Sequence, residues 1–91
     1  MILISYDISD DKLRTNFSKY LKKFGYRLQY SLFEIKNSDR LLNNIKIDLD
    51  SHFKKKFGEK DNVIIIETSK NCKITKYGFT KHDNDDIIVL D

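Results

Sequence analysis

The chain has 91 residues, a formal net charge of +3, one cysteine and no proline. A chain of this length makes one domain with a thin core, which excludes a separate catalytic domain. The lone Cys72 excludes an intrachain disulfide, and the isolated His52 and His82 do not have zinc-ligand spacing. Neither a signal peptide nor a membrane-spanning apolar run is visible, so we expect a cytoplasmic protein that does not bind a membrane.

The charge is distributed unevenly along the chain. Residues 12–36 carry seven basic side chains and one acid, Glu34, whereas residues 82–91 carry four aspartates and neither lysine nor arginine. This asymmetry favours a polyanionic partner for the first half of the chain. A lysine-rich helix face is, however, more often simply solvated.

Residues 1–7 alternate as a strand, in which Leu3, Ser5 and Asp7 share one face and Ile2, Ile4 and Tyr6 the other. Ser9 is the expected N-cap of the following helix, and Gly25 is its expected C-terminal signal. The apolar stripe of this helix has helical spacing and consists of Leu13, Phe17, Tyr20, Leu21 and Phe24.

Residues 26–36 alternate as one long strand or as two strands with a bend near Tyr30–Ser31, and the residues alone do not decide between these. Ser38 is expected to cap a second helix that ends at Gly58. Further strands are predicted over 62–68, 74–79 and 87–90.

This order of elements predicts an α+β fold of the ferredoxin-like type, with two helices on one face of a small sheet. Residues 63–66 and 87–90 are apolar on both faces, and two helices can cover only one. A two-fold homodimer that packs sheet against sheet is the simplest cover for the second face.

Asp7 ends an apolar strand, where a carboxylate is costly to bury without compensation. One interpretation makes it a capping residue at the start of the helix. The other makes it a ligand of Mg²⁺, which takes one or two protein carboxylates and several waters. The second interpretation needs two copies of Asp7, one from each protomer, facing each other across the dimer axis.

Five segments of the chain resemble the CRISPR-associated Cas2 family, the small subunits of the spacer-acquisition machinery that are often labelled endoribonucleases. The segments are YDI (6–8), SDDKLR (9–14), QYSLFE (29–34), DNVIIIET (61–68) and NCKITKYGF (71–79). The resemblance implies a ferredoxin-like βαββαβ domain over residues 1–80, with residues 26–36 divided into two strands. It also implies an extra C-terminal strand and a tail, residues 81–91, that packs at a homodimer interface.

The resemblance implies that Asp7 is the catalytic, metal-binding residue, paired across the two-fold axis and holding Mg²⁺ or Mn²⁺. Arg14 and Arg27 would contact nucleic acid, and we expect the same of Lys12 in the basic first half. The supporting positions would be Tyr6, Ser31 and Phe33, which would otherwise be residues of the core or of a bend. Asn16 stands where some relatives have a second arginine.

Several functions follow as hypotheses. The first is a homodimer that bridges copies of the Cas1 integrase and holds the double-stranded DNA of a spacer precursor. The second is a Mg²⁺-dependent endonuclease that hydrolyses phosphodiesters of RNA or DNA, including single-stranded RNA. The alternative is a stand-alone RNA-cleaving toxin of the virulence-associated protein D type. A sheet that stacks RNA bases ranks last, because residues 62–68 offer no aromatic side chain.

Overall fold

Residues 1–68 and 71–79 are described by the computed structural model. The elements in chain order are β1 (Ile2–Asp7), α1 (Asp11–Lys22), β2 (Gly25–Gln29), β3 (Leu32–Ile35), α2 (Asp39–Asp48), a π-helical turn (Leu49–Phe53), a 3-10 turn (Lys54–Lys56), β4 (Asn62–Glu67) and β5 (Lys73–Gly78). The strand predicted over 87–90 and the tail predicted to reach a partner lie outside the described residues.

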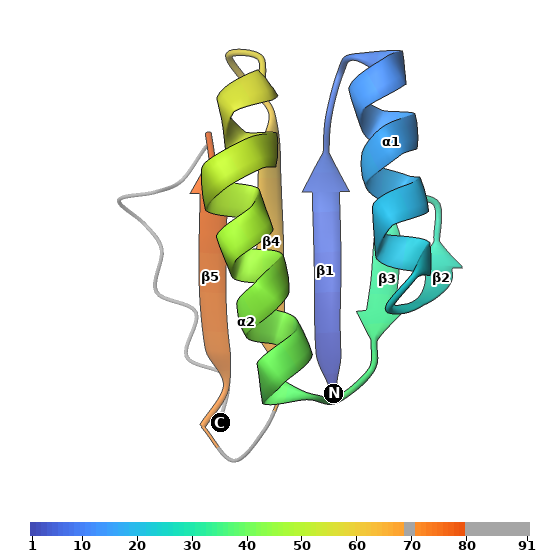
Figure 1. The fold of residues 1–91 in the computed structure, drawn as a ribbon, viewed down its shortest axis with the longest axis vertical. Coiled ribbons are helices and arrows are strands. Elements are labelled where there is room, and N and C mark those ends of the chain that lie inside the picture. The colour runs from blue at the N-terminus through green and yellow to red at the C-terminus, as the bar shows by residue number, and fades with distance from the viewer. Residues whose placement is uncertain (69–70, 80–91) are drawn as a thin grey trace.

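The five strands form one sheet in the order β2-β3-β1-β4-β5, and all neighbouring strands are antiparallel (Figure 1). The first four strands and the two helices make the ferredoxin-like βαββαβ unit, and β5 extends the sheet beyond β4. This arrangement confirms the predicted α+β fold.

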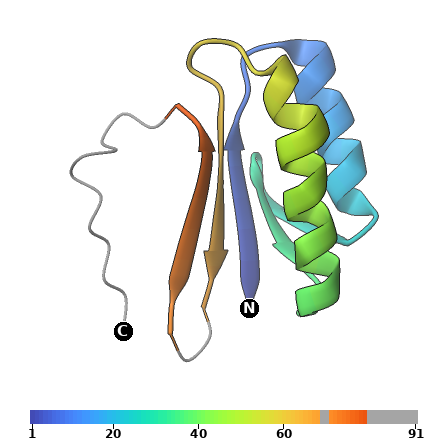
Figure 2. The same cartoon turned by 60° about the vertical axis from the view of Figure 1, so that its left-hand side comes forward.

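Both helices lie on the same face of the sheet (Figure 2). β1 alternates between buried and partly exposed positions, so Tyr6, which is 4% exposed, points into the core while Asp7 is exposed. The largest buried side chains come from both layers: Ile4, Phe33, Ile35, Val63 and Ile65 from strands, and Phe17, Leu21, Ile45 and Leu49 from helical segments.

The ends of α1 differ from the prediction. Asp10, rather than Ser9, is the N-cap, and its carboxylate accepts a hydrogen bond from Leu13 N at 2.8 Å. Gly25 does not end the helix but begins β2, where a Cβ atom would lie 2.0 Å from the carbonyl oxygen of Glu34. A glycine is therefore required there for the close approach of β2 to β3.

The 26–36 segment is divided into two strands, as the family resemblance implies. β2 and β3 form a hairpin whose turn contains Tyr30 and Ser31, and the pairing shifts between Arg27 and Gln29. Tyr6 N donates to Ser31 O at 3.1 Å, which fixes this turn to the end of β1. The hairpin turn and Asp7 therefore lie at the same end of the sheet.

The second face of the sheet is covered by neither helix (Figure 2). The strand register places five apolar side chains on it, all of them only half-buried: Leu3, Leu32, Ile64, Ile66 and Ile74. Asp7 belongs to the same face by alternation along β1. The surplus of apolar surface predicted from residues 63–66 is therefore present in the fold.

Candidate functional site

Asp7 is the last residue of β1, and its side chain is exposed. It lines a cavity of about 300 Å³ with Tyr6, Ile8, Arg14, Tyr30 and Ser31. Its carboxylate makes no hydrogen bond or ion pair to another described residue. Both carboxylate oxygens can therefore receive a ligand, and the capping interpretation of Asp7 is wrong, because Asp10 caps α1.

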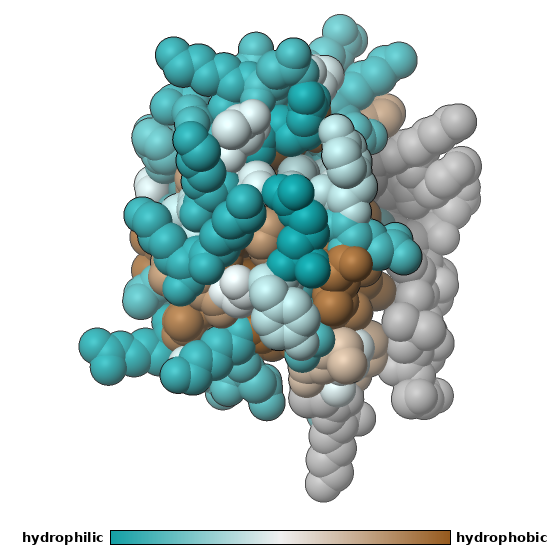
Figure 3. Space-filling view, turned by 90° about the vertical axis from the view of Figure 1, so that its right-hand side faces the viewer, coloured by the Kyte–Doolittle hydropathy of each residue, from teal (hydrophilic) through white to brown (hydrophobic). Residues whose placement is uncertain are grey.

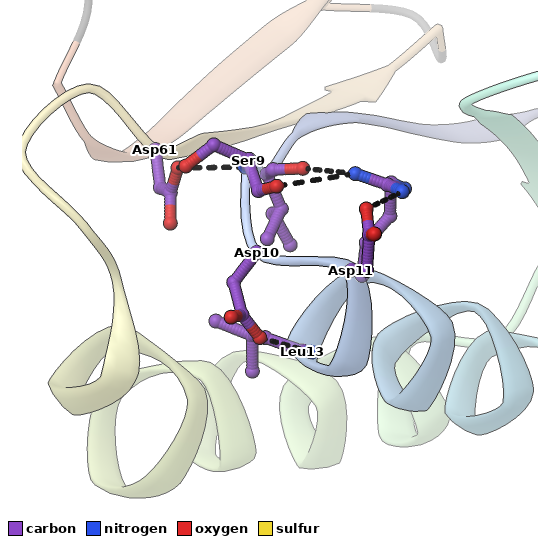
Figure 4. A network of polar contacts seen from close by, with 7 residues as sticks. Ser9, Asp10, Asp11, Leu13 and Asp61 are labelled. Atoms are coloured by element: carbon purple, nitrogen blue, oxygen red, sulfur yellow. Dashed lines mark hydrogen bonds and ion pairs between the residues drawn. The ribbon is translucent and has the colours of Figure 1, made fainter.

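Asp61 holds the segment that follows Asp7 (Figure 4). Its Oδ1 accepts hydrogen bonds from the backbone N–H and the hydroxyl of Ser9, both at 3.0 Å, and its Oδ2 accepts from Gly58 N at 2.7 Å. Burial acts to raise the pKa of Asp61, but these three hydrogen bonds outweigh it and lower the pKa below its ordinary value. A buried charge is thus compensated by three donors.

Arg14 holds the same segment from the other side. Its guanidinium donates to the carbonyl oxygens of Ile8, at 3.0 Å, and Ser9, at 3.4 Å, and pairs with the exposed carboxylate of Asp11. The hydrogen bond to Asp11 raises the pKa of Arg14. Arg14 therefore fixes the backbone that follows Asp7 and also adds a positive charge near Asp7.

A second cavity, of about 260 Å³, lies between α1 and β2, and we call it the basic groove. Its lining includes Arg14, Lys19, Lys22 and Arg27, together with Ser18 and Tyr30, and in the described part of the chain it includes no acidic residue. The surface over α1 and β2 is predominantly hydrophilic (Figure 3). Four cations in one concave surface favour a polyanionic ligand.

Arg27 is held in a defined orientation in the basic groove. Its guanidinium donates to Ser18 Oγ, and its Cζ atom lies 5.3 Å from the centroid of the Phe33 ring. Phe33 itself is fully buried on β3, where it also packs against Tyr6 with a centroid distance of 6.2 Å. Phe33 and Tyr6 are therefore core residues: Phe33 contacts the guanidinium of Arg27, and Tyr6 packs against Phe33.

The structure brings most of the predicted site residues to one end of the sheet. Asp7, Arg14, Tyr6 and Ser31 line the first cavity, and Arg14 and Tyr6 also line the basic groove with Arg27. Lys12 is exposed on α1 and lines neither cavity.

Other residues of the site were not predicted. Ser18 and Lys22 follow Arg14 at intervals of four residues, so helical spacing was the signal that could have found them. Asn62 is the cross-strand partner of Asp7 on β4, and the two side chains share one face. That pairing depends on the strand register, which the sequence alone does not fix.

The family model for CRISPR associated protein Cas2 matches residues 1–76 of the chain. The chain belongs to the Cas2 family. Its Cas2 relatives include a "CRISPR-associated endoribonuclease Cas2 2" of Methanospirillum hungatei, 29% identical over 97% of both chains. Another is a "CRISPR-associated endoribonuclease Cas2" of Mycobacterium tuberculosis, 33% identical over 85% of this chain and 65% of the relative.

A shorter match joins this Cas2 chain to a "CRISPR-associated endoribonuclease Cas2 3" of Chloroflexus aurantiacus, 59% identical over 32 residues, which are 35% of this chain and 34% of the relative. The comparison with solved structures found no significant match. Within the described residues, no helix combines the length and the apolar character that crossing a membrane requires.

The exposed carboxylate of Asp7 has the donor chemistry of a divalent-cation ligand. Asp7 offers an exposed oxygen donor of the kind that Mg²⁺ takes, and Mg²⁺ commonly needs only one or two protein carboxylates. Among residues 1–68 and 71–79, no group of three or more His, Cys, Asp or Glu side chains is placed to hold a metal. A divalent cation bound at Asp7 would therefore need further ligands beyond the side chains of these described residues.

Proposed function

We propose that this Cas2 protein acts in CRISPR adaptation as a homodimer that binds nucleic acid and bridges copies of the Cas1 integrase. We further propose that Asp7 from the two copies supports Mg²⁺-dependent, or Mn²⁺-dependent, cleavage of phosphodiesters. The names of the relatives support the nuclease part of the proposal. The proteins of Methanospirillum hungatei, Mycobacterium tuberculosis and Chloroflexus aurantiacus are named endoribonucleases, and one Thermus thermophilus protein is named an endonuclease.

One observation carries the proposal: the basic groove and the Asp7 cavity are contiguous. Arg14, Tyr6 and Tyr30 line both of them. A polyanion held along the groove would therefore reach the carboxylate at the end of β1. No acidic side chain of residues 1–68 or 71–79 lines the groove. The repulsion of a phosphate backbone by these residues therefore begins only near Asp7, where a cation would offset it.

The basic groove is suited to phosphates rather than to particular bases. Arg27 presents a planar guanidinium already oriented by Ser18 and Phe33, which suits bidentate contact with a phosphate. Lys19 and Lys22 add point charges from the exposed face of α1. Binding through such contacts is tolerant of sequence and sensitive to salt.

In the proposed homodimer, the two copies of Asp7, one from each protomer, would together hold the metal ion. When bound, Mg²⁺ would supply Lewis-acid activation of the phosphodiester. Among the described residues, Asp7 is the only carboxylate that lines its cavity, and no histidine or lysine lines it. The chain would therefore hold the cation through Asp7 and orient the nucleic-acid backbone through Arg14 and Arg27. Asp61 would keep the segment that follows Asp7 in place.

The test compares wild type with Asp7→Asn in three assays on the same preparations: cleavage, nucleic-acid binding, and integration in the presence of Cas1. We expect Asp7→Asn to lose Mg²⁺-dependent cleavage of RNA and DNA while it keeps its oligomeric state, because Asp7 is exposed and the substitution keeps the shape of its side chain. We expect assembly with Cas1 and integration to persist. Cleavage that survives the substitution would contradict the metal site.

The integration assay separates the two parts of the proposal. If integration is lost together with cleavage while assembly survives, the metal site belongs to the biological reaction. If the protein neither binds duplex nor joins Cas1 but its expression kills cells that contain no CRISPR genes, the adaptation role is contradicted. A stand-alone toxin would then replace it.

A further inference from the structure

Tyr30 is the most exposed large aromatic or aliphatic side chain in the described part of the chain, with 81% of its surface accessible. It lies in the turn of the β2–β3 hairpin. Its hydroxyl makes no hydrogen bond and its ring makes no aromatic contact with any described residue. Neither packing nor hydrogen bonding within residues 1–68 and 71–79 explains a tyrosine at this position.

The other four tyrosines each have such an explanation. Tyr6 and Tyr77 are buried, at 4% and 8% exposure. The hydroxyls of Tyr20 and Tyr26 donate to carboxylates, those of Asp48 and Glu34 respectively. Tyr30 is the one tyrosine that is neither buried nor hydrogen-bonded through its hydroxyl to a described residue.

The backbone that carries Tyr30 is fixed although its side chain is exposed. Tyr6 N donates to Ser31 O at 3.1 Å, and Leu32, at the start of β3, is paired with both Ser5 and Gln29. An aromatic ring on a fixed backbone loses little conformational entropy when it binds a ligand, because it has only two side-chain torsions to order.

Tyr30 stands at the junction of the two cavities. It lines the basic groove with Arg27 and Lys22 and also lines the cavity that contains Asp7. A nucleic acid whose phosphates follow the groove therefore brings its bases past this ring. Alternating cations and an exposed aromatic ring are typical of surfaces that bind single strands.

We propose that Tyr30 is a stacking site for an unpaired nucleobase at the entrance to the Asp7 cavity. The inference rests on the proposed nucleic-acid function and adds to it a preference for single-stranded over double-stranded nucleic acid. A base in an intact duplex already has both faces covered by its neighbours, so only a single-stranded or frayed segment can stack on Tyr30. Any base has a π face, so the site selects single strands without selecting a sequence.

The test uses the full chain and a single-stranded oligonucleotide that contains one 2-aminopurine, whose fluorescence is quenched on stacking. Wild type, Tyr30→Phe and Tyr30→Ala are compared for affinity and quenching, and an intact duplex of the same length is the second ligand. Tyr26→Ala is the matched control, because Tyr26 is a 58% exposed tyrosine of the same hairpin that lines neither cavity.

We expect Tyr30→Ala to weaken single-strand binding about tenfold, within the range measured for loss of one stacked base. The quenching of 2-aminopurine fluorescence should also fall in Tyr30→Ala, while its affinity for the duplex stays as in wild type. Tyr30→Phe and Tyr26→Ala should behave as wild type. Replacing the reporter with an abasic nucleotide should remove the difference between wild type and Tyr30→Ala.

Three outcomes overturn the inference, and each has a different meaning. If Tyr30→Ala binds and quenches the single strand as wild type does, the stacking site is wrong while the nucleic-acid function stands. If it weakens single strand and duplex equally, Tyr30 supports the groove and selects nothing. If wild type binds neither ligand at any salt concentration, the proposed function fails and the stacking site fails with it.

Discussion

At the scale of single residues, Asp61 joins segments that lie 52 positions apart in the sequence. Its three hydrogen bonds hold Ser9, two residues after Asp7, against the turn before β4. The geometry of the Asp7 cavity therefore depends on a carboxylate that does not line it.

Asp61→Asn tests the contribution of this carboxylate. The substitution removes the charge and turns an NH₂ group toward one of the three donors. We expect a loss of about 1–3 kcal/mol in the free energy of unfolding at pH 7, measured by urea denaturation. Glu59→Gln, in the same turn but exposed, is the control and should change stability by less than about 0.5 kcal/mol.

The difference in unfolding free energy between wild type and Asp61→Asn should depend on pH if the ionised carboxylate of Asp61 causes it. Because the folded pKa of Asp61 lies below its ordinary value of 3.8, its contribution is present above that value and is lost as the pH falls through the folded pKa. The gap between wild type and Asp61→Asn should therefore narrow as the pH is lowered below about 4. A gap that is unchanged at pH 3 would contradict the role of the ionised carboxylate.

Sequence reasoning at this scale works for side-chain direction and fails for long-range partners. Alternation along β1 correctly places Tyr6 inside and Asp7 outside. Ser9 has the right residue type for an N-cap, but Asp61 takes its hydroxyl and backbone N–H, so Asp10 caps α1 instead. A local propensity cannot reveal a competitor 52 positions away.

At the scale of elements, α1 serves two purposes with opposite faces. Leu13, Phe17 and Leu21 pack into the core, while Arg14, Lys19 and Lys22 line the basic groove. The hydroxyl of Tyr20 donates to Asp48 of α2, which ties the two helices together. Burial is the largest cause that raises the pKa of Tyr20, and the hydrogen bond to Asp48 raises this pKa further.

The basic groove should account for the salt dependence of nucleic-acid binding. We expect the double substitution Lys22→Ala with Arg27→Ala to weaken duplex binding and to reduce the slope of log affinity against log salt by about two, since each phosphate contact contributes about one. Lys55→Ala with Lys56→Ala removes the same charge from the turn after α2 and is the control. Equal effects of the two double variants would mean that net charge, rather than the groove, determines binding.

The elements themselves were predicted unevenly. After Ser38, helical spacing of apolar residues predicts one inward face made of Leu41, Leu42, Ile45, Leu49 and Phe53. The last four are buried and Leu41 is partly buried against the core, but nothing in this spacing indicates the change to a π-helical turn at Leu49. The division of residues 26–36 came from the family resemblance alone. The turn at Tyr30–Ser31 contains no glycine or proline, because the hydrogen bond from Tyr6 N stabilises it instead.

At the scale of the whole molecule, the sheet has one face under the helices and one face outside them (Figure 2). The outer face gathers half-buried apolar side chains from four strands, and Asp7 lies at its end. Antiparallel sheets commonly leave one face to solvent, but that face is then polar. An apolar outer face, with an exposed carboxylate at its end, fits the proposed sheet-to-sheet homodimer.

Ile66→Lys tests this homodimer. Ile66 lies between Leu3 and Ile74 on the outer face and is only half-buried in one protomer, so the variant should still fold. In a sheet-to-sheet dimer the new ammonium group would be buried without a partner, at a cost of several kcal/mol. We expect sedimentation analysis to show a dimer for wild type and a monomer for Ile66→Lys.

Ile47→Lys is the matched control, because Ile47 is 61% exposed on α2, a helix that lies on the other face of the sheet (Figure 2). It should remain dimeric. The monomeric Ile66→Lys should also lose Mn²⁺ binding, measured by electron paramagnetic resonance, because each protomer holds one Asp7. A dimer that survives Ile66→Lys would place the interface elsewhere, and a monomer that still binds Mn²⁺ with wild-type affinity would show that Asp7 does not need its partner copy.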